Sequence, residues 1–216
     1  MKRLVCLLTV LSVVMGASLV ASAFSLDGDA SYLFGLGKEA KGQGFAANTK
    51  VEVFDNIFAD AAFSFINFKN EDKGETRADT FLTIGGLYRV ASEEDLEVFV
   101  GGGYGMLSFT ATGPENDEEV EELDAEPSND NKGSGFYGKF GFKFVPAEKF
   151  TLLADVSYAP KFKFGEEDAK SLLSARATVA YEVMENISVQ GTIKHYRSGD
   201  DINSGILVGG GVSFTF

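Results

Sequence analysis

Apolar and polar side chains alternate with a period of two along most of the chain beyond residue 24. One segment places Phe136, Phe140 and Phe142 on one face, with Lys139 and Lys143 on the other. The same alternation recurs in most later and earlier segments, and helical spacing fits none of them well. Strict alternation indicates strands that have one apolar and one polar face.

Ten such strands are predicted, bounded by changes in the alternation. Their ranges are 25–37, 44–54, 57–68, 79–90, 96–109, 136–145, 150–164, 172–183, 187–197 and 205–216. These lengths match or exceed the roughly 9–11 residues that a tilted strand needs to cross a bilayer. The pattern predicts an all-β fold, an up-and-down antiparallel transmembrane β-barrel of about ten strands, with eight as the alternative. The barrel is expected to be one domain over residues 24–216.

The connections between these strands alternate in length. Short turns are expected at 55–56, 91–95, 146–149 and 184–186, and longer links at 38–43, 69–78, 110–135, 165–171 and 198–204. Outer-membrane barrels have short periplasmic turns and longer external loops. An even strand number also places both termini on the periplasmic side.

Residues 1–23 are predicted to be a cleaved signal peptide. Lys2 and Arg3 precede an uncharged apolar run, and Ala21-Ser22-Ala23 is a small-residue cleavage site. The alternative, a membrane anchor, would need about 20 apolar residues. The one cysteine, Cys6, lies in this leader, so residues 24–216 hold neither a disulfide nor a cysteine metal ligand.

The charge of the chain limits which partners it can bind, and the charges within the strands indicate which strand face lines the lumen. Because Lys2 and Arg3 are the only charges of the leader, the chain's formal charge of −13 becomes −15 for residues 24–216, which excludes nucleic acid as a partner. A lipid-facing cation at mid-bilayer costs about 2–4 kcal/mol, so in a membrane the polar face must line the lumen. The fifteen polar-face charges are Asp27, Asp29, Lys50, Glu52, Asp60, Arg89, Glu97, Lys139, Lys143, Asp155, Lys161, Lys163, Arg176, Glu182 and Lys194.

The alternative to a membrane barrel is a soluble barrel whose apolar strand faces point inward and whose charged faces point outward. The loop asymmetry weighs against it, and so does the apolar-facing end residue Phe216. An interfacial aromatic girdle is also expected, because tyrosines lie on the apolar face near strand ends at Tyr32, Tyr88, Tyr104, Tyr158 and Tyr181.

Two segments resemble a known family. The run from Leu96 to Met106, LEVFVGGGYGM, is similar to the glycine-rich strand of small Gram-negative outer-membrane β-barrels of the opacity/OmpA type, and Gly209–Phe216 is similar to their closing strand. The resemblance implies a place among outer-membrane lipids and lipopolysaccharide, and folding by the outer-membrane assembly machinery. That machinery would recognise Phe214 and Phe216. The expected count of ten strands departs from the eight of the smallest members.

The function expected is that of an integral outer-membrane protein with a structural, surface-interaction or minor transport role, without enzymatic activity or cofactor. A narrow porin-like diffusion channel is one alternative. The other is a lipid A deacylase-like enzyme, because His195 precedes Ser198 in a motif distantly similar to that family's. Because the two residues are three positions apart, their side chains would point to opposite faces of the strand. A nucleophile and its general base must instead lie within hydrogen-bond distance of each other, which argues against this enzyme.

Two further motifs are better explained by structure than by ligand binding. The glycines of 101–105 lie inside a predicted strand with neither a following helix nor a lysine-serine pair, so close backbone packing is favoured over a phosphate loop. The acidic segment 115–130 lacks the ligand spacing of a calcium loop. A solvated loop is favoured there, with weak divalent-cation binding as the alternative.

Deletion of Phe216 is expected to impair membrane insertion, because the last strand must close the barrel to leave no unpaired edge. Heat-modifiable migration on gels measures the folded fraction in cells. An unchanged folded yield would contradict the assignment of this residue.

Overall fold

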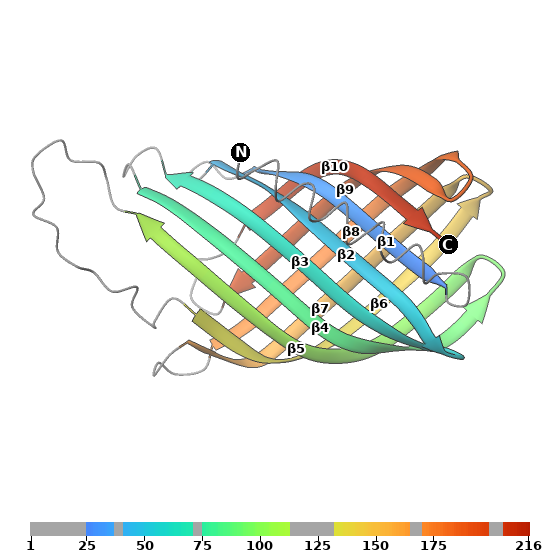
Figure 1. Ribbon diagram of the computed structural model, residues 1–216, viewed down its shortest axis with the longest axis horizontal. Coiled ribbons are helices and arrows are strands. Elements are labelled where there is room, and N and C mark those ends of the chain that lie inside the picture. The colour runs from blue at the N-terminus through green and yellow to red at the C-terminus, as the bar shows by residue number, and fades with distance from the viewer. Residues whose placement is uncertain (1–24, 37–40, 71–74, 113–131, 165–169, 199–204) are drawn as a thin grey trace, which may run out of the picture.

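The computed structural model describes residues 25–36, 41–70, 75–112, 132–164, 170–198 and 205–216. It is a closed barrel in which every strand pairs antiparallel with its sequence neighbour and the first strand pairs with the last (Figure 1). The strands are β1 Leu26–Gly35, β2 Lys41–Phe54, β3 Ile57–Asn70, β4 Glu75–Glu93, β5 Leu96–Thr112, β6 Lys132–Ala147, β7 Phe150–Phe164, β8 Lys170–Met184, β9 Ile187–Ser198 and β10 Gly205–Thr215. No helix in the described ranges is long and apolar enough to span a membrane.

The predicted fold class and the count of ten strands are confirmed. Most strand ends agree with the sequence to within a few residues, but β4 and β6 each begin four residues earlier than expected, at Glu75 and Lys132. Both extensions lie in charged or glycine-containing sequence that carries little apolar alternation, which is why the pattern did not include them. The predicted leader, residues 1–23, lies outside the described residues.

The last residue completes the closure of the barrel. The Phe216 amide donates to the Leu26 carbonyl at 2.9 Å, and the Leu26 amide donates to the Phe216 carbonyl at 2.8 Å. The ring of Phe214 lies over Gly28, where a Cβ atom would collide with the ring carbon Cζ. The terminal aromatic residues therefore contribute to the β1–β10 seam through backbone bonds and through side-chain packing.

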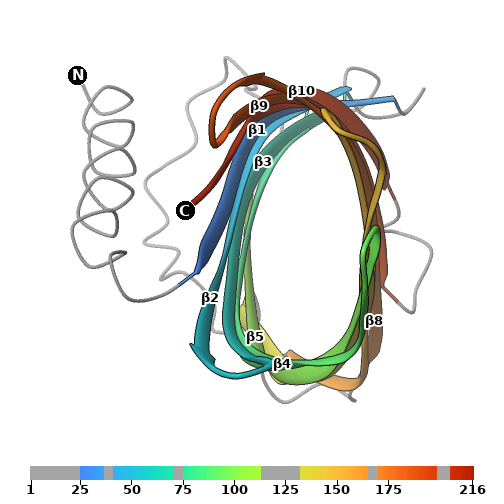
Figure 2. The same ribbon diagram turned by 90° about the vertical axis from the view of Figure 1, so that its right-hand side faces the viewer.

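Glycine pairs lie where the barrel bends most. Viewed along its axis the barrel is flattened, with β4 and β5 at one end of the long diameter and β9 and β10 at the other (Figure 2). Gly85 faces Gly103 across β4–β5, and Gly191 faces Gly210 across β9–β10. A Cβ atom at Gly103 would meet the carbonyl oxygen of Ile84, so the backbones approach too closely there for a side chain. This supports close packing as the reading of the glycine-rich run.

Two of the short turns use asparagine in the left-handed region. Asn56, between β2 and β3, has φ of 67°, and Asn186, between β8 and β9, has φ of 66°. Asparagine adopts this conformation more readily than most residues that have a Cβ atom. These turns lie at the end of the barrel that also holds Leu26 and Phe216, called the turn end below; the opposite end is called the loop end.

A bulge in β7 reverses the two faces of that strand near the loop end. The β7–β8 register shifts between Ala159 and Phe162, leaving one extra residue in β7. Pro160 lies in the shift, and proline has no amide hydrogen for a ladder bond, so it is found at bulges. Phe162 therefore points inward and is 1% exposed, while Lys161 and Lys163 are exposed on the outside. The prediction that these two lysines line the lumen is wrong for this reason.

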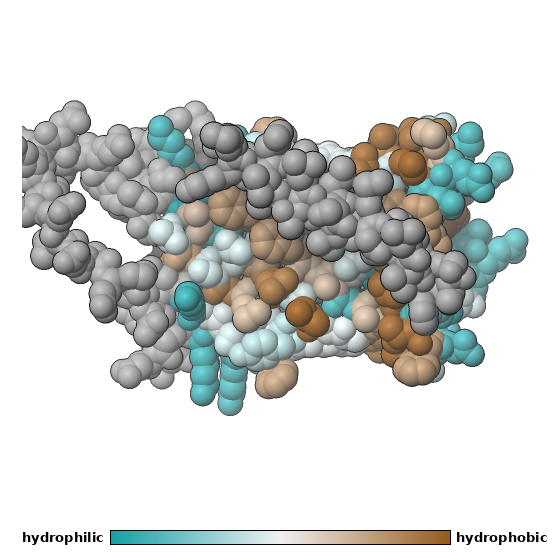
Figure 3. Space-filling model, viewed as in Figure 1, coloured by the Kyte–Doolittle hydropathy of each residue, from teal (hydrophilic) through white to brown (hydrophobic). Residues whose placement is uncertain are grey.

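On the face that Figure 3 shows, apolar side chains gather between the two ends, and most of the strongly hydrophilic ones lie near the ends. The five girdle tyrosines all point outward, with exposed fractions between 41% and 52%. Tyr104 makes an edge contact with Phe136, which is 76% exposed. Large apolar side chains thus cover the outside of the barrel, whereas most of the charged residues of the strands point inward.

Candidate functional site in the barrel lumen

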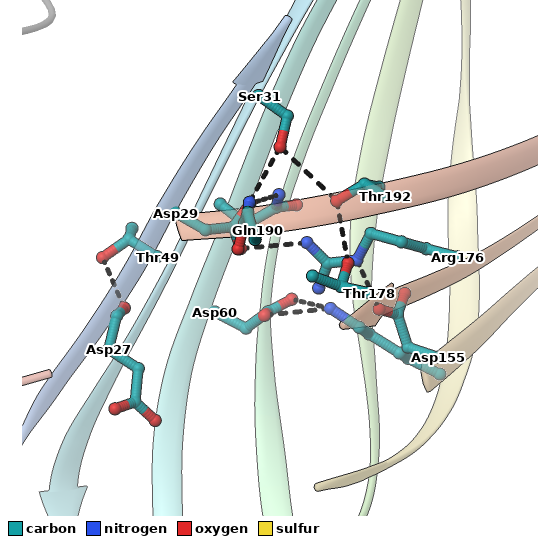
Figure 4. A network of polar contacts seen from close by, with 12 residues as sticks. Asp27, Asp29, Ser31, Thr49, Asp60, Asp155, Arg176, Thr178, Gln190 and Thr192 are labelled. Atoms are coloured by element: carbon teal, nitrogen blue, oxygen red, sulfur yellow. Dashed lines mark hydrogen bonds and ion pairs between the residues drawn. The ribbon is translucent and has the colours of Figure 1, made fainter. Parts of the chain in front are cut away.

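Arg176 is the centre of an ion-pair network halfway along the lumen (Figure 4). From β8, its guanidinium donates to Asp155 on the neighbouring strand β7 at 2.7 Å and to Asp29 on β1 at 3.0 Å. Two strands, β9 and β10, separate β8 from β1 in the barrel order. The Arg176–Asp29 bond therefore crosses the interior of the barrel and does not merely join adjacent strands.

A second ion pair crosses the lumen from another direction. The Lys139 ammonium on β6 contacts both carboxylate oxygens of Asp60 on β3, at 2.9 and 3.0 Å. These two side chains are only 10% and 6% exposed. Because β4 and β5 lie between the two strands, this pair also bridges the interior. Charged hydrogen bonds are the stronger kind, so the two bridges hold opposite walls together.

Neutral side chains extend this network toward the loop end. Gln190 donates to Ser31 at 2.8 Å, Ser31 and Thr192 lie 3.5 Å apart, and Thr192 lies 3.0 Å from Thr178 (Figure 4). All four side chains are buried. Asn48 also donates to Asp29 at 2.8 Å. Buried polar groups need such partners, and the lumen provides them from side chains that are far apart in sequence.

Arg89 organises the turn end of the lumen. It bonds to Glu52 at 3.2 Å, to Glu97 at 3.0 Å and to the side-chain oxygen of Asn56 at 2.9 Å. Bonds from one guanidinium thus reach β2, β5 and the turn between β2 and β3.

Lys50 lies beside this group and combines two kinds of contact. Its ammonium pairs with Asp27 at 3.0 Å and lies 4.0 Å from the ring centre of Phe99. Phe99, Phe58 and Leu87 form a small apolar cluster on the inner wall. The inner face is thus less uniformly polar than the alternation suggested.

Apolar side chains also fill much of the lumen near the loop end. One cluster contains Leu33, Ala46, Ile66 and Leu207, and a second contains Tyr137, Ala159, Phe162 and Leu172. The alternation places Tyr137 and Leu207 on the inner face, but it did not predict these apolar clusters, because each face was assigned by the character of most of its side chains. Pro160 was the signal that could have located Phe162.

The sequence reading also missed Arg77 and Asp79. Arg77 Nε lies 2.6 Å from Asp79 Oδ1, and the guanidinium stacks on the ring of Phe109. Both residues belong to the early part of β4, and Arg77 precedes the strand start expected from sequence. A charged pair is therefore present among the apolar clusters of the loop end.

The space left inside the barrel is small and divided. A cavity of about 150 Å³ opens at the turn-end half and is lined by Lys50, Lys143, Asp155 and Arg176 among others. Two cavities of about 40 Å³ lie further along, one beside Lys194 and Tyr196 and the other among the polar network. A water molecule needs at least roughly 10–15 Å³ measured this way. The smaller cavities thus hold a few waters at most.

The structure brings together most of the predicted lumen charges. Lys50, Glu52, Asp60, Lys139, Asp155 and Arg176 are in the ion pairs above. Lys143 lines the turn-end cavity, Lys194 donates to Ser64 at 3.3 Å, and Glu182 is half-buried on the inner face of β8. The inner face therefore carries both signs of charge in close mixture.

The candidate chemical motifs do not converge on this network. His195 lies on the outer face of β9, opposite in direction to Lys194, and its Nδ1 is 3.1 Å from the carbonyl oxygen of Gly205. Nothing is described for the Ser198 side chain or for the acidic segment 115–130, which lies outside the described residues. Within the described ranges no three His, Cys, Asp or Glu side chains gather as a metal site would require.

Comparison with known proteins finds fold likeness but no family. No family model matches the chain, and neither does any curated protein. Among solved structures, it is similar to a bacterial polysaccharide outer membrane secretin, with 12% identity, a TM-score of 0.47, and coverage of 89% of this chain and 65% of that one. An outer membrane channel from Pseudomonas putida F1 matches with 7% identity, a TM-score of 0.47, and coverage of 89% and 95%.

A third likeness is to Neisserial surface protein A, with 12% identity, a TM-score of 0.40, and coverage of 90% of this chain and 98% of that one. The chain spans about two thirds of the secretin and nearly all of the other two. At such identities and TM-scores no activity can be transferred, so the barrel's own residues must indicate the function. Membership of the opacity/OmpA-type group stays a prediction.

The substitution Lys139→Met is expected to destabilise the folded barrel by about 3–5 kcal/mol, because it leaves the buried Asp60 carboxylate without its partner. The double change Lys139→Met with Asp60→Asn should recover much of this loss. Urea unfolding of the refolded protein in phosphatidylcholine vesicles measures both. Lys149→Met, in an exposed turn, is the matched control. A Lys139→Met loss no larger than the control's would show that the bridge does not hold the walls together.

Proposed function

We propose that this chain is an integral β-barrel protein of the bacterial outer membrane whose lumen is closed, and that its role is structural or in surface interaction. The observation that carries this proposal is the pair of ion bridges across the lumen, Lys139–Asp60 and Arg176–Asp29. The proposal includes membership of the opacity/OmpA-type group, whose members are small outer-membrane barrels.

The exterior supports a membrane location. Large apolar side chains such as Ile84, Phe140 and Val179 are half-exposed in the middle of strands. A soluble protein rarely exposes so continuous an apolar surface, whereas a bilayer requires it. The closed strand order also satisfies the other requirement of lipid, that no backbone edge be left unpaired.

The interior supports a closed barrel over a porin. Small barrels have room inside for little more than side chains, and here two ion bridges and the neutral network around Ser31 and Gln190 span that room. A selective pore commonly carries a ring of one charge sign, but each of these bridges joins opposite signs. Opening a path would require breaking buried charged bonds.

A narrow diffusion channel is the alternative that the turn-end cavity of about 150 Å³ favours. The lipid-modifying enzyme has less support. His195 points away from the lumen, and its Nδ1 contacts a backbone carbonyl where a catalytic histidine would need an orienting acid and a nucleophile. We therefore propose no catalytic residue and no cofactor.

The proposal also covers the orientation of the barrel in the membrane and the processing of the chain. Residues 1–23 act as a cleaved leader, both barrel termini lie in the periplasm, and the assembly machinery recognises Phe214 and Phe216. The pairing of Phe216 with Leu26 supports this recognition, because the last strand has to be delivered to the first. Outer-membrane lipids and lipopolysaccharide surround the barrel, and segment 115–130 binds divalent cations weakly at most.

Single cysteines at Gly113 or Asp200 are expected to react with membrane-impermeant reagents on intact cells, whereas cysteines at Asn56 or Glu185 should react only after lysis. The reason is that short turns face the periplasm and long loops face outward. Labelling of all four sites on intact cells would contradict the membrane location, and the reverse pattern would invert the barrel.

Refolded protein in planar bilayers is expected to conduct ions poorly, because charged bonds block the lumen. The paired change Lys139→Ala with Asp60→Ala should increase conductance, since it removes one bridge and both bulky side chains. Glu94→Ala with Lys149→Ala, in exposed turns, is the control. Large, steady conductance from the unmodified protein would reject the closed lumen and support the channel.

A further inference from the structure

Three lysines form a basic patch on the outside of the barrel at the loop end. Lys132 lies on β6 and Lys161 and Lys163 on β7, and all three side chains are exposed. Lys161 and Lys163 point outward only because the bulge at Pro160 reverses the faces of β7. Bulges commonly re-aim side chains at functional positions, which makes this patch a candidate site.

The residues around the patch combine polar and apolar groups. Lys163 pairs across β6–β7 with Ser134, whose hydroxyl oxygen lies 2.7 Å from the Tyr104 hydroxyl. Across β5–β6, Ser134 faces Met106, which is 46% exposed, and Tyr104 faces Phe136. The lysines therefore lie just beyond an exposed aromatic and aliphatic surface.

The height of the patch matches the headgroup level of a bilayer. A strand tilted as in outer-membrane barrels rises roughly 2.5 Å along the barrel axis per residue, so Lys132 lies about 30 Å from the outward-facing Phe144 near the turn end. The apolar band of such barrels is about 25 Å tall. By the same measure Lys163, which pairs with Ser134, lies about 25 Å from that level and Lys161, two residues further toward the turn end, about 20 Å. The ammonium groups of Lys132 and Lys163 are thus expected at or above the edge of the hydrocarbon, and the long side chain of Lys161 can carry its ammonium group toward that edge.

Within the part of the chain that the structure describes, the patch has no counter-charge. No carboxylate of the described residues lies within ion-pair distance of Lys132, Lys161 or Lys163. Lumen cations such as Arg176 have two carboxylate partners by contrast. Three exposed lysines close together repel one another, so an anionic group bound among them would be stabilised by all three.

We propose that Lys132, Lys161 and Lys163 bind the phosphate groups of an outer-leaflet lipid, whose acyl chains lie along Phe136 and Met106. This inference rests on the proposed outer-membrane location. Lysine binds phosphate as a compact point charge, and the apolar surface immediately below it suits the attached chains. A phosphorylated glycolipid fits both parts, whereas a soluble phosphate fits only the first.

The test is native mass spectrometry of the folded protein in detergent, titrated with diphosphoryl lipid A and, separately, with the same lipid after removal of its phosphates. Lys161→Gln with Lys163→Gln is expected to weaken binding of the phosphorylated lipid roughly thirtyfold, at about fivefold for each lysine near an anionic surface. Lys161→Arg with Lys163→Arg should retain binding. Lys149→Gln, at the turn end, is the matched control and should bind as the unmodified protein does.

Two outcomes would overturn the inference. If the glutamine variant bound diphosphoryl lipid A with unchanged affinity, the lysines would not bind lipid phosphates, and another anionic partner, such as the chain's own acidic segment 115–130, would be indicated. An equal loss for the dephosphorylated lipid would mean that the patch holds acyl chains and not phosphate. Heat-modifiable migration in phosphatidylcholine vesicles is measured first for every variant. If the unmodified protein does not insert, the proposed function fails; if it inserts without phosphate preference, only this inference fails.

Discussion

The pairing of β1 with β10 is the constraint on which the rest of the structure depends. An open ten-stranded sheet would leave two rows of backbone donors and acceptors without partners, and in a bilayer each such group costs several kcal/mol. The exchange of bonds between Leu26 and Phe216 extends this seam to the last residue. Once the seam is closed, alternate side chains of every strand must enter one enclosed space, so closure converts a repeating sequence pattern into an interior.

The size of that interior explains the chemistry found in it. A barrel of ten strands encloses a narrow interior that its inner side chains occupy to a large extent. Charged residues from opposite walls meet, as Arg176 meets Asp29, because both side chains enter the same narrow lumen, where little solvent reaches them. Apolar residues such as Leu33 and Phe162 fill the loop end. At the β4–β5 end of the flattened section, Gly85 and Gly103 let the backbones come together where side chains would collide.

The bulge at Pro160 links the inside of the barrel to its outside. One extra residue places Phe162 in the apolar cluster beside Leu172 and turns Lys161 and Lys163 to the rim. A single irregularity thus fills space within the lumen and creates the basic patch that we assign to lipid phosphates. The same reversal in mid-strand would have placed cations in hydrocarbon, so its position near the strand end matters energetically.

The sequence by itself determined the strand number, the order of short and long connections and the direction of most side chains, because a strand's two faces alternate strictly and burial or lipid contact acts on every second residue. It could not determine which lumen charges meet, since Lys139 and Asp60 are 79 positions apart and are joined only by closure. Neither could it reveal that Arg77 belongs to β4 and pairs with Asp79, or that the faces reverse at Pro160. Those features depend on how neighbouring strands align and how much room remains between opposite walls, and only the closed tertiary structure decides both.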